Sequence, residues 1–492
     1  MPDRVETASV VEPIAVDIQR NRVLGIAIAV MASVLWTANA GADVSEKIAD
    51  RLAGAMKFET VSYENPADFD GAPFDALEAY LRSLYPRAHS TLQLEKINDY
   101  TLLFEWPGSN ELLAPGLFMS HLDVVPVEPA AAEKWTHPPY GGVIEEGYAW
   151  GRGALDVKIG VILWLEAVEA LLEEGFEPER TLYLSFGHDE EIGGKFGAKV
   201  VAERFKEEGV RLAYLFDEGG MLLEGHPLLP ETVVANIVTA EKTFYTVELT
   251  ARGVSGHSSM PPPSTAIGKL SRAIHAVEMN PMPARISKPL REMLETASPH
   301  LSPGMRFATG NLWLTGWLLK RGMQTSDLNS ALLRTTFATT LISGGVKSNV
   351  LPEIAEATIN VRILPGDTPE QVLEHLERVI DDPEIEIKGI SWGEAAPAAS
   401  VEGPAFRFAA EAVAAVLPDA VILPGLVPGG TDSRHFAGVS EEILRFVPMR
   451  VSTDLVGGAH GRDERIEVEH LANSRAIAIG MIRRGAAAPA AD

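Results

Sequence analysis

His121 and Asp123 are residues whose types and spacing could support metal-ion chemistry. They follow the apolar run Leu117–Met119, which predicts a buried strand that ends at the histidine. Residues two apart in an extended chain point to the same face, so both side chains emerge together. A histidine beside a carboxylate is a metal ligand with a partner that orients it. A solvent-exposed histidine and aspartate in a loop is the competing interpretation of this short pattern.

Further carboxylates follow other predicted strands. Glu190 and Glu191 come after the strand predicted for Thr181–Phe186, and Asp217 comes after the strand predicted for Leu212–Phe216. Strands that alternate with helices form largely parallel sheets, whose ligands bind at the carboxyl ends of the strands. Separate loops that deliver a histidine and carboxylates to one sheet edge favour a metal site there.

The elements that must position these residues alternate along the chain. Helices are predicted within Ser45–Tyr85, which the turn-rich Ser62–Pro73 interrupts, and at Lys158–Glu174 and Gly197–Glu208; Leu92–Glu105 reads as strands. After residue 240 the pattern becomes that of a small α+β domain with an antiparallel sheet. Its predicted strands and helices are Phe244–Ala251, Ala266–Val277, Glu356–Leu364, Pro369–Asp381 and Ile385–Ser391, around a Pro- and Met-rich segment, Asn280–Ser343.

From about Pro397 the first pattern resumes, so the second domain is inserted into the first. Helices Pro404–Val416 and Val468–Arg484 and strands near Val421 and at Ile443–Val447 are predicted there. The predicted divisions are a signal peptide or membrane anchor (1–44), a catalytic domain in two parts (45–240 and 397–484), an inserted lid (241–396) and a disordered tail (485–492).

Size, charge and composition exclude several classes of protein. A chain of 492 residues predicts two or more domains, and a net charge of −26 with a pI near 4.9 excludes a large basic surface for nucleic acid. The absence of cysteine excludes disulfides, thiolate ligands and cysteine nucleophiles. Any metal must therefore be held by histidines and carboxylates.

The N-terminal part contains an apolar segment. Val23–Ala42 carries no charge, and Ala38-Asn39-Ala40 resembles a signal-peptide cleavage site. About 20 uncharged residues would also suffice for an uncleaved membrane anchor. Both interpretations place the protein outside the cytoplasm, either periplasmic or secreted. A buried helix of a cytosolic protein is the third interpretation.

Eight motifs occur in an order and spacing that is similar to a known family. They are SHLDVVP, GRGALDVK, HDEEIGG, DEGG, GVSGHSSMPP, SNVLPEIAEATINVR, GGTDSRHF and GAHGRDERI. The chain after residue 50 resembles the zinc metallopeptidase family that includes aminoacylase, bacterial glutamate carboxypeptidase and yeast carboxypeptidase S. FETVSY and GRGALDVK are most similar to the carboxypeptidase S branch, which includes hydrolases of N-fatty-acyl amino acids. The resemblance implies an α/β fold: a mostly parallel-sheet, dinuclear-zinc catalytic domain with an inserted α+β lid of the dimerisation type.

The resemblance implies two Zn²⁺ ions per chain, for which Co²⁺ or Mn²⁺ could substitute. His121 and Asp217 would hold one ion, Glu191 and His460 the other, and Asp156 would bridge both. The competing role for Asp156 is to cap the helix that follows it. Glu218 and His188 lie beside predicted ligands and are assigned no metal role.

The resemblance also implies the catalytic groups. Glu190 would be the general base acting with a metal-bridging hydroxide, and Asp123 would orient His121. If the chain is extended here, Glu190 and Glu191 point apart, so that one faces the water and the other a metal.

Three lid residues match family positions that contact substrate. His257 matches a histidine that stabilises the tetrahedral oxyanion and that comes from the partner subunit in dimeric relatives. Asn349 and Arg362 match positions that bind the terminal carboxylate of the substrate. The loop Gly429–Phe436 either shapes the substrate pocket or only forms turns.

The expected function is zinc-dependent hydrolysis of an amide bond next to a free carboxylate, by a carboxypeptidase or an N-acyl-amino-acid amidohydrolase. The substrate would be a small peptide or an N-acyl amino acid. The serine-hydrolase motif G-x-S-x-G and the zinc motif H-E-x-x-H are absent from the sequence. The alternative is a non-catalytic, metal-bound binding protein of the same fold. For Leu312–Leu319, packing in the lid core is preferred to a lipid-like acyl pocket. The sequence does not identify the acyl group or the amino acid of the substrate. It also does not show whether the enzyme hydrolyses or forms the amide bond, or whether it is a monomer or a homodimer.

Overall fold

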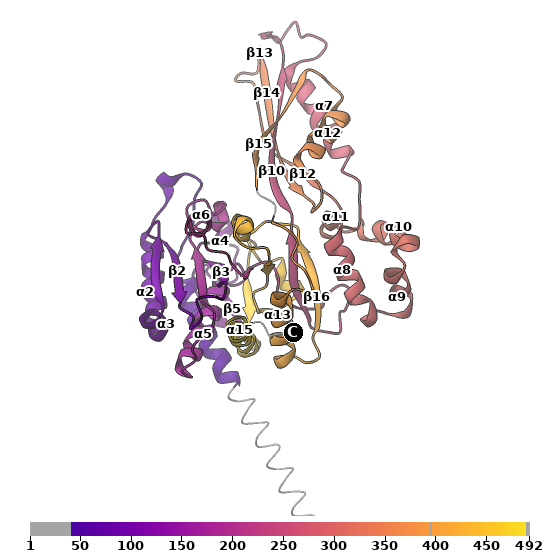
Figure 1. Cartoon of the computed structure of the whole chain (residues 1–492). Coiled ribbons are helices and arrows are strands. Elements are labelled where there is room, and N and C mark those ends of the chain that lie inside the picture. Colours follow the sequence, from indigo (N-terminus) through magenta and orange to yellow (C-terminus); the bar gives the residue numbers. More distant parts are fainter. Residues whose placement is uncertain (1–40, 394–395, 489–492) are drawn as a thin grey trace, which may run out of the picture.

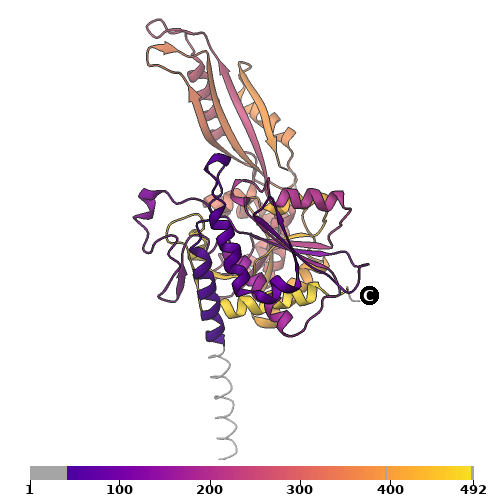
Figure 2. The same ribbon diagram turned by 90° about the vertical axis from the view of Figure 1, so that its left-hand side faces the viewer.

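The computed structural model describes residues 41–393 and 396–488, which form an α/β body and a lid that projects from it (Figure 1). Turned by 90°, the lid is a narrow projection from one end of the body (Figure 2). Within these residues, no helix is long and apolar enough to cross a membrane. Most of Val23–Ala42 lies outside the described part, so its predicted role as signal peptide or anchor, and the extracytoplasmic location, stay predictions.

The body is built on a sheet of ten strands, which is parallel at its centre. Its path is β1-β2-β6-β3-β7-β17-β9-β8-β18, and β16 pairs with β9. The bounds are β1 (Gln93–Ile97), β2 (Thr101–Trp106), β3 (Gly116–His121), β6 (Leu182–Gly187), β7 (Tyr214–Asp217), β8 (Leu222–Glu224), β9 (Val234–Glu241), β16 (Val421–Val427), β17 (Ile443–Arg445) and β18 (Arg450–Ser452). β3 is parallel to both β6 and β7, whereas β1 and β2 form an antiparallel edge. The predicted mostly parallel α/β fold is confirmed.

Helices cover both faces of this sheet. The chain is helical over 41–56; the further helices of the body are α2 (Ala72–Leu84), α3 (Pro86–Thr91), α4 (Pro129–Ala132), α5 (Lys158–Glu173), α6 (Ala198–Glu207), α13 (Pro404–Val416), α14 (Thr453–Val456) and α15 (Leu471–Gly485), with 3-10 turns η1 (Pro66–Asp68), η2 (Glu190–Ile192) and η4 (Asp432–Gly438). A three-stranded sheet of β4 (Val143–Glu145), β5 (Tyr148–Trp150) and β19 (Arg465–Glu467) completes the body.

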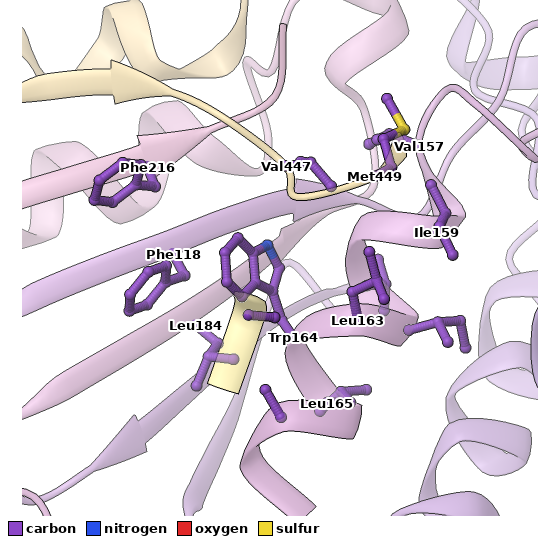
Figure 3. Packing of buried hydrophobic residues seen from close by; sticks show 14 of the residues in the cluster. Phe118, Val157, Ile159, Leu163, Trp164, Leu165, Leu184, Phe216, Val447 and Met449 are labelled. Atoms are coloured by element: carbon purple, nitrogen blue, oxygen red, sulfur yellow. The ribbon is translucent and has the colours of Figure 1, made fainter. Parts of the chain in front are cut away.

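β3 is buried on both faces, which explains why its sequence is a continuous apolar run. Phe118 points into the larger core, where its ring lies 4.7 Å from that of Trp164 on α5 and stacks on Phe216 (Figure 3). Leu117 and Met119 point to the opposite face, toward α6. Each large core side chain of this kind stabilises the fold by roughly 1.5–3 kcal/mol, so the strand that ends at the site is held rigidly.

The lid contains a four-stranded antiparallel sheet in the order β12-β14-β10-β15. Its elements are β10 (Thr243–Arg252), α7 (Ala266–Met279), β12 (Thr336–Gly344), β14 (Ile354–Ile363), α12 (Pro369–Ile380) and β15 (Ile385–Trp392). Alternate residues of β14 are buried, and they share a core with α7 and α12. A two-stranded ribbon of β11 (Gly256–His257) and β13 (Val350–Leu351) forms the tip of the lid (Figure 1).

The long segment inside the lid forms α8 (Lys288–Ala297), η3 (Ser298–His300), α9 (Pro303–Gly310), α10 (Leu312–Met323) and α11 (Asp327–Leu333). Ala297 and Leu301 pack against Leu423 of β16, so this segment lies beside the body. Leu312 packs against the cluster that α8 and α11 form. The prediction that Leu312–Leu319 packs in the lid core is wrong for Trp313 and Trp317, which point into solvent. Their exposure also excludes an enclosed acyl pocket at these two side chains.

Candidate metal centre

His121 lies at the carboxyl end of β3 and is buried. Its Nε2 atom is 3.1 Å from Asp156 Oδ1 and 3.5 Å from Glu218 Oε1. Its Nδ1 atom is 2.9 Å from the backbone oxygen of Asp123 and 3.3 Å from the carboxylate of that residue. A proton on Nδ1 would satisfy these acceptors and leave the Nε2 lone pair free. This arrangement favours the tautomer of His121 in which Nε2 can bind a metal ion.

Asp156 joins His121 to a second histidine. Its other oxygen, Oδ2, lies 3.0 Å from Nε2 of His460, and the same nitrogen lies 3.0 Å from Glu191 Oε2. The helix that follows is capped at Val157 without a side-chain hydrogen bond, so the helix-capping role for Asp156 is wrong. One carboxylate therefore connects two imidazoles, and each imidazole has another carboxylate beside it.

Asp123 holds two loops together beneath the cluster. Its fully buried carboxylate accepts a hydrogen bond from the Ser62 hydroxyl over 2.6 Å. It also accepts hydrogen bonds from the backbone N–H groups of Glu190 over 3.2 Å and Glu191 over 3.1 Å. Burial alone would raise the pKa of Asp123, but the neighbouring His121 and these donors lower it. Asp123 thus stays ionised and fixes the backbone that carries both glutamates.

A buried ion pair beneath the Asp156 loop was not predicted from the sequence. Arg152 Nη1 lies 2.6 Å from Glu464 Oε2, and Glu464 Oε1 accepts the backbone N–H groups of Leu155 and Asp156 at 2.8 and 3.1 Å. Arg152 also donates to the carbonyl of His460 over 3.2 Å. The pair fixes Asp156 and His460 relative to each other. Both residues stand inside quoted motifs, but nothing in either motif indicates the other as its partner.

Asp217 and Glu218, at the end of β7, have different surroundings from those predicted. The Asp217 carboxylate accepts the backbone N–H groups of Glu218 at 2.9 Å and Ser433 at 2.7 Å. Glu218, to which no role was assigned, points to His121 instead. Within the described chain, Glu218 forms with His121 and Glu190 a group that could hold a metal ion, and Asp217 belongs to none. The structure therefore does not place Asp217 beside His121.

Glu190 and Glu191 belong to the 3-10 turn η2, so the extended backbone expected for them is wrong. Their side chains nevertheless diverge: Glu191 groups with His121 and Asp156, whereas Glu190 groups with His121 and Glu218. Burial, the charge of Glu218 and then that of Asp432 raise the pKa of Glu190 well above its ordinary value.

The donor set fits divalent cations. Burial foremost raises the pKa of Glu190, Glu191 and Glu218, the last to about 7. One buried oxygen of Glu191 has no hydrogen-bond partner among the described residues. Positive charge placed among these groups would offset the repulsion between the carboxylates and occupy the unpaired oxygen. Imidazole nitrogens with carboxylate oxygens are ligands of zinc and of related divalent metals.

The three predicted lid residues lie in two separate places. Arg362 is half-buried at the base of the lid, where a Cβ atom at Gly430 would lie 3.8 Å from its Nη1 atom and 3.7 Å from Arg434 Nη1. Burial and then Arg434 lower the pKa of Arg362. His257, in β11, and Asn349, directly before β13, are exposed at the tip of the lid (Figure 1). The structure thus brings only Arg362 toward the body of its own chain.

The loop Gly429–Phe436 makes specific contacts with the site. The backbone N–H of Thr431 donates to Glu241 over 2.8 Å, and Glu241 forms a fully buried ion pair with Arg445 at 2.8 Å. Arg434 donates to the carbonyl of Gly193, directly after η2, over 2.9 Å. With the bond from Ser433 to Asp217, the loop connects the ends of β16, β7 and β6.

An α/β body that gathers histidines and carboxylates in one cluster, with an inserted lid, is typical of metallohydrolases. Residues 117–484 match the model of the peptidase family M20/M25/M40. The chain therefore belongs to this family, as the resemblance predicted.

The sequences of related proteins match most of the chain. Probable carboxypeptidase S-like 2 of Dictyostelium discoideum is 36% identical over 430 residues, which cover 86% of this chain and 82% of that protein. N-fatty-acyl-amino acid synthase/hydrolase PM20D1 of Xenopus tropicalis is 35% identical over 428 residues, covering 86% and 83%. The M20 family metallo-carboxypeptidase Sso-CP2 of Sulfolobus solfataricus has the same fold, with a TM-score of 0.63 at 20% identity over 88% of this chain and 98% of that one. The chain is an enzyme of carboxypeptidase or amidohydrolase type.

Proposed function

We propose that this enzyme uses two Zn²⁺ ions to hydrolyse an amide bond next to a free carboxylate. The observation that carries the proposal is the position of Asp156, with one oxygen beside each histidine. His121 and Glu218 would hold one ion, His460 and Glu191 the other, and Asp156 would bridge them. Glu218 takes the place that the family resemblance assigned to Asp217, because the oxygens of Asp217 accept backbone N–H groups.

Glu190 is proposed as the general base. When bound, the ions would polarise the scissile carbonyl and make the attacking water more acidic. Glu190 would accept a proton from that water and pass it to the leaving amine. Asp123 supports this step because it holds the N–H of Glu190 and the ring of His121 at once. Arg152 and Glu464 would keep Asp156 and His460 in place.

Recognition of the free carboxylate is assigned to Arg362 with Arg434. Both guanidinium groups lie beside Gly430, and the charges of Glu190 and Glu241 act on Arg362, which supports a role for the pair close to the proposed base. Arginine is suited to this role because its planar group can donate two parallel hydrogen bonds to a carboxylate. A side chain at position 430 would begin in contact with both guanidinium groups, so the glycine keeps them free of a neighbouring side chain there.

His257 and Asn349 are proposed to act on the substrate bound by a second copy of the chain. Both are exposed at the tip of the lid, which is the end farthest from the body (Figure 1). In the proposed two-fold dimer, the lid tip of each copy would contact the body of the other copy. There, His257 would donate a hydrogen bond to the oxyanion of the tetrahedral intermediate.

The proposed function is tested by metal analysis together with a substrate panel. Zinc is measured per chain after dialysis, and hydrolysis is measured for dipeptides, N-acetyl amino acids and N-long-chain-acyl amino acids. The relatives described as carboxypeptidase S-like and as N-fatty-acyl-amino acid synthase/hydrolase make the first and last groups the leading candidates. Hydrolysis of none of these by metal-loaded protein, or full activity in a chelator, would contradict the proposal.

A further inference from the structure

The outer face of α10 is apolar and exposed. Trp313 and Trp317 are 85% and 65% exposed, and Leu314 and Leu318 also face solvent. Residues four apart lie on the same side of a helix, so the four side chains form one face. The inner face of α10 packs through Leu312 against the cluster that α8 and α11 form. The exposed face is therefore additional to the side chains that fix the helix in place.

The preceding helix also exposes apolar side chains. Phe307 and Met305 of α9 are exposed, and α9 contacts α10. Both helices lie at the outer edge of the molecule, on the side of α8 away from β16 (Figure 1). We call Met305, Phe307, Trp313, Leu314, Trp317 and Leu318 the α9–α10 surface. Single exposed apolar side chains are ordinary, whereas a group of this kind marks an interaction site.

The charge around the α9–α10 surface is opposite to that of the whole chain. Residues 296–326 contain no Asp or Glu but include Arg306, Lys320 and Arg321, in a chain with a net charge of −26. Within the described chain, none of these three cations has a carboxylate partner within 4.0 Å, since Arg306 and Lys320 donate to backbone carbonyls. Arg321 is exposed and follows Trp317 by one helical turn.

We propose that the α9–α10 surface binds an anionic lipid bilayer. Indole rings and leucines beside basic residues that have no carboxylate partner are the composition of helices that lie in the bilayer interface. There the rings enter the headgroup region and the cations contact lipid phosphates. A symmetric contact between two copies would instead bring two basic patches together. Peripheral binding would place the enzyme at the surface where lipid-like molecules partition, whatever amide it hydrolyses.

The absence of cysteine makes a direct test simple. Leu314→Cys in the full chain is labelled with a polarity-sensitive fluorophore and mixed with vesicles of phosphatidylglycerol and phosphatidylcholine. We expect a blue shift and protection from an aqueous quencher. The matched control is Leu112→Cys, which labels a 94% exposed leucine in the loop between β2 and β3 and should show neither effect. Because both labelled chains retain Val23–Ala42, attachment through that segment would affect them equally.

Two further measurements identify what binds to the α9–α10 surface. In the labelled chain, Arg306→Gln with Arg321→Gln should raise the lipid concentration for half-maximal shift about tenfold or more, since each basic residue strengthens contact with anionic lipid. Vesicles of phosphatidylcholine alone should give a weaker response. A label at 314 that stays fully accessible while the chain sediments with anionic vesicles would overturn the proposal. So would shielding that depends on protein concentration without vesicles, which would identify a second copy as the occupant.

Discussion

The carboxylate of Asp123 accepts the backbone N–H of Glu190 over 3.2 Å, so one aspartate positions the proposed base directly. The same carboxylate is 3.3 Å from Nδ1 of His121. The two contacts connect the end of β3 to the turn after β6. Asp123 therefore acts through its neighbours and belongs to no metal-ligand group among the described residues.

Asp123→Asn should lower metal affinity or kcat about 10–100-fold, the usual effect of removing the partner of a metal-ligating histidine. The amide keeps the size of the side chain but loses the negative charge beside His121. It also loses one of the two oxygens that accept the N–H groups of η2. Ser62→Ala, which removes only the hydroxyl contact to Asp123, is the matched control and should lose less. Zinc titration and steady-state kinetics on the folded protein provide the measurement. Full activity with only a lower Tm would assign Asp123 a purely structural role.

Glu190→Gln should reduce kcat about 100-fold or more, the scale of general acid–base catalysis. The amide retains the shape of the side chain but cannot accept the proton of the water. Zinc content should stay near that of the unchanged chain, because Glu190 is not a proposed ligand. Glu203→Gln, at an exposed position of α6, is the control. Unchanged turnover in the Glu190 variant would rule out its role as base.

Glu218→Gln and Asp217→Asn distinguish the two ligand assignments at β7. We expect Glu218→Gln to lose about one zinc ion per chain, because its carboxylate faces His121. Asp217→Asn should retain both ions but unfold at lower temperature, since the amide cannot accept from both Glu218 and Ser433. Elemental analysis and thermal unfolding measure the two effects. The reverse pattern would restore Asp217 as the ligand.

Arg362→Ala should impair hydrolysis of substrates with a free carboxylate far more than that of their amides or esters. The guanidinium is proposed to bind the substrate carboxylate. Removing the guanidinium should therefore leave kcat/KM nearly unchanged for substrates that lack the carboxylate. kcat/KM is compared for matched acid and amide substrates. Arg252→Ala, at an exposed position of the same sheet, controls for general effects on the lid. Equal losses on acid and amide would remove Arg362 from substrate recognition.

Mixing Glu190→Gln with His257→Ala should restore activity that neither variant has alone. If His257 acts on the partner copy, about half of randomly mixed dimers contain both chains, and each holds one complete site. Activity should then approach about a quarter of that of the unchanged enzyme. The subunits are mixed under conditions that allow exchange, and size-exclusion chromatography follows the dimer. No recovery in a mixture that contains mixed dimers would show that His257 does not act across the interface.

The sequence by itself determined the fold class and indicated most residues of the candidate site. The apolar run before His121 and the helical spacing of Lys158–Glu174 lead to β3 and α5, because burial on both faces of a sheet and on one side of a helix leaves periodic patterns. The resemblance of the ordered motifs to the family assigns metal-binding roles to His121, Asp156, Glu191 and His460, and the structure brings these side chains together. The apolar patterns depend only on local geometry, and the motif match depends only on the order and spacing of residues.

Only the tertiary structure distinguishes the surroundings of Asp217 from those of Glu218, because adjacent acids at a strand end are equivalent in sequence and the backbone N–H of Ser433 donates to Asp217. It likewise revealed the pairing of Arg152 with Glu464 across the chain, and the exposed face of α10. The apolar spacing of Trp313 and Trp317 fits a helix buried in a core as well as one facing a membrane. Which side of α10 meets the protein depends on contacts with α8 and α11, which no local pattern contains.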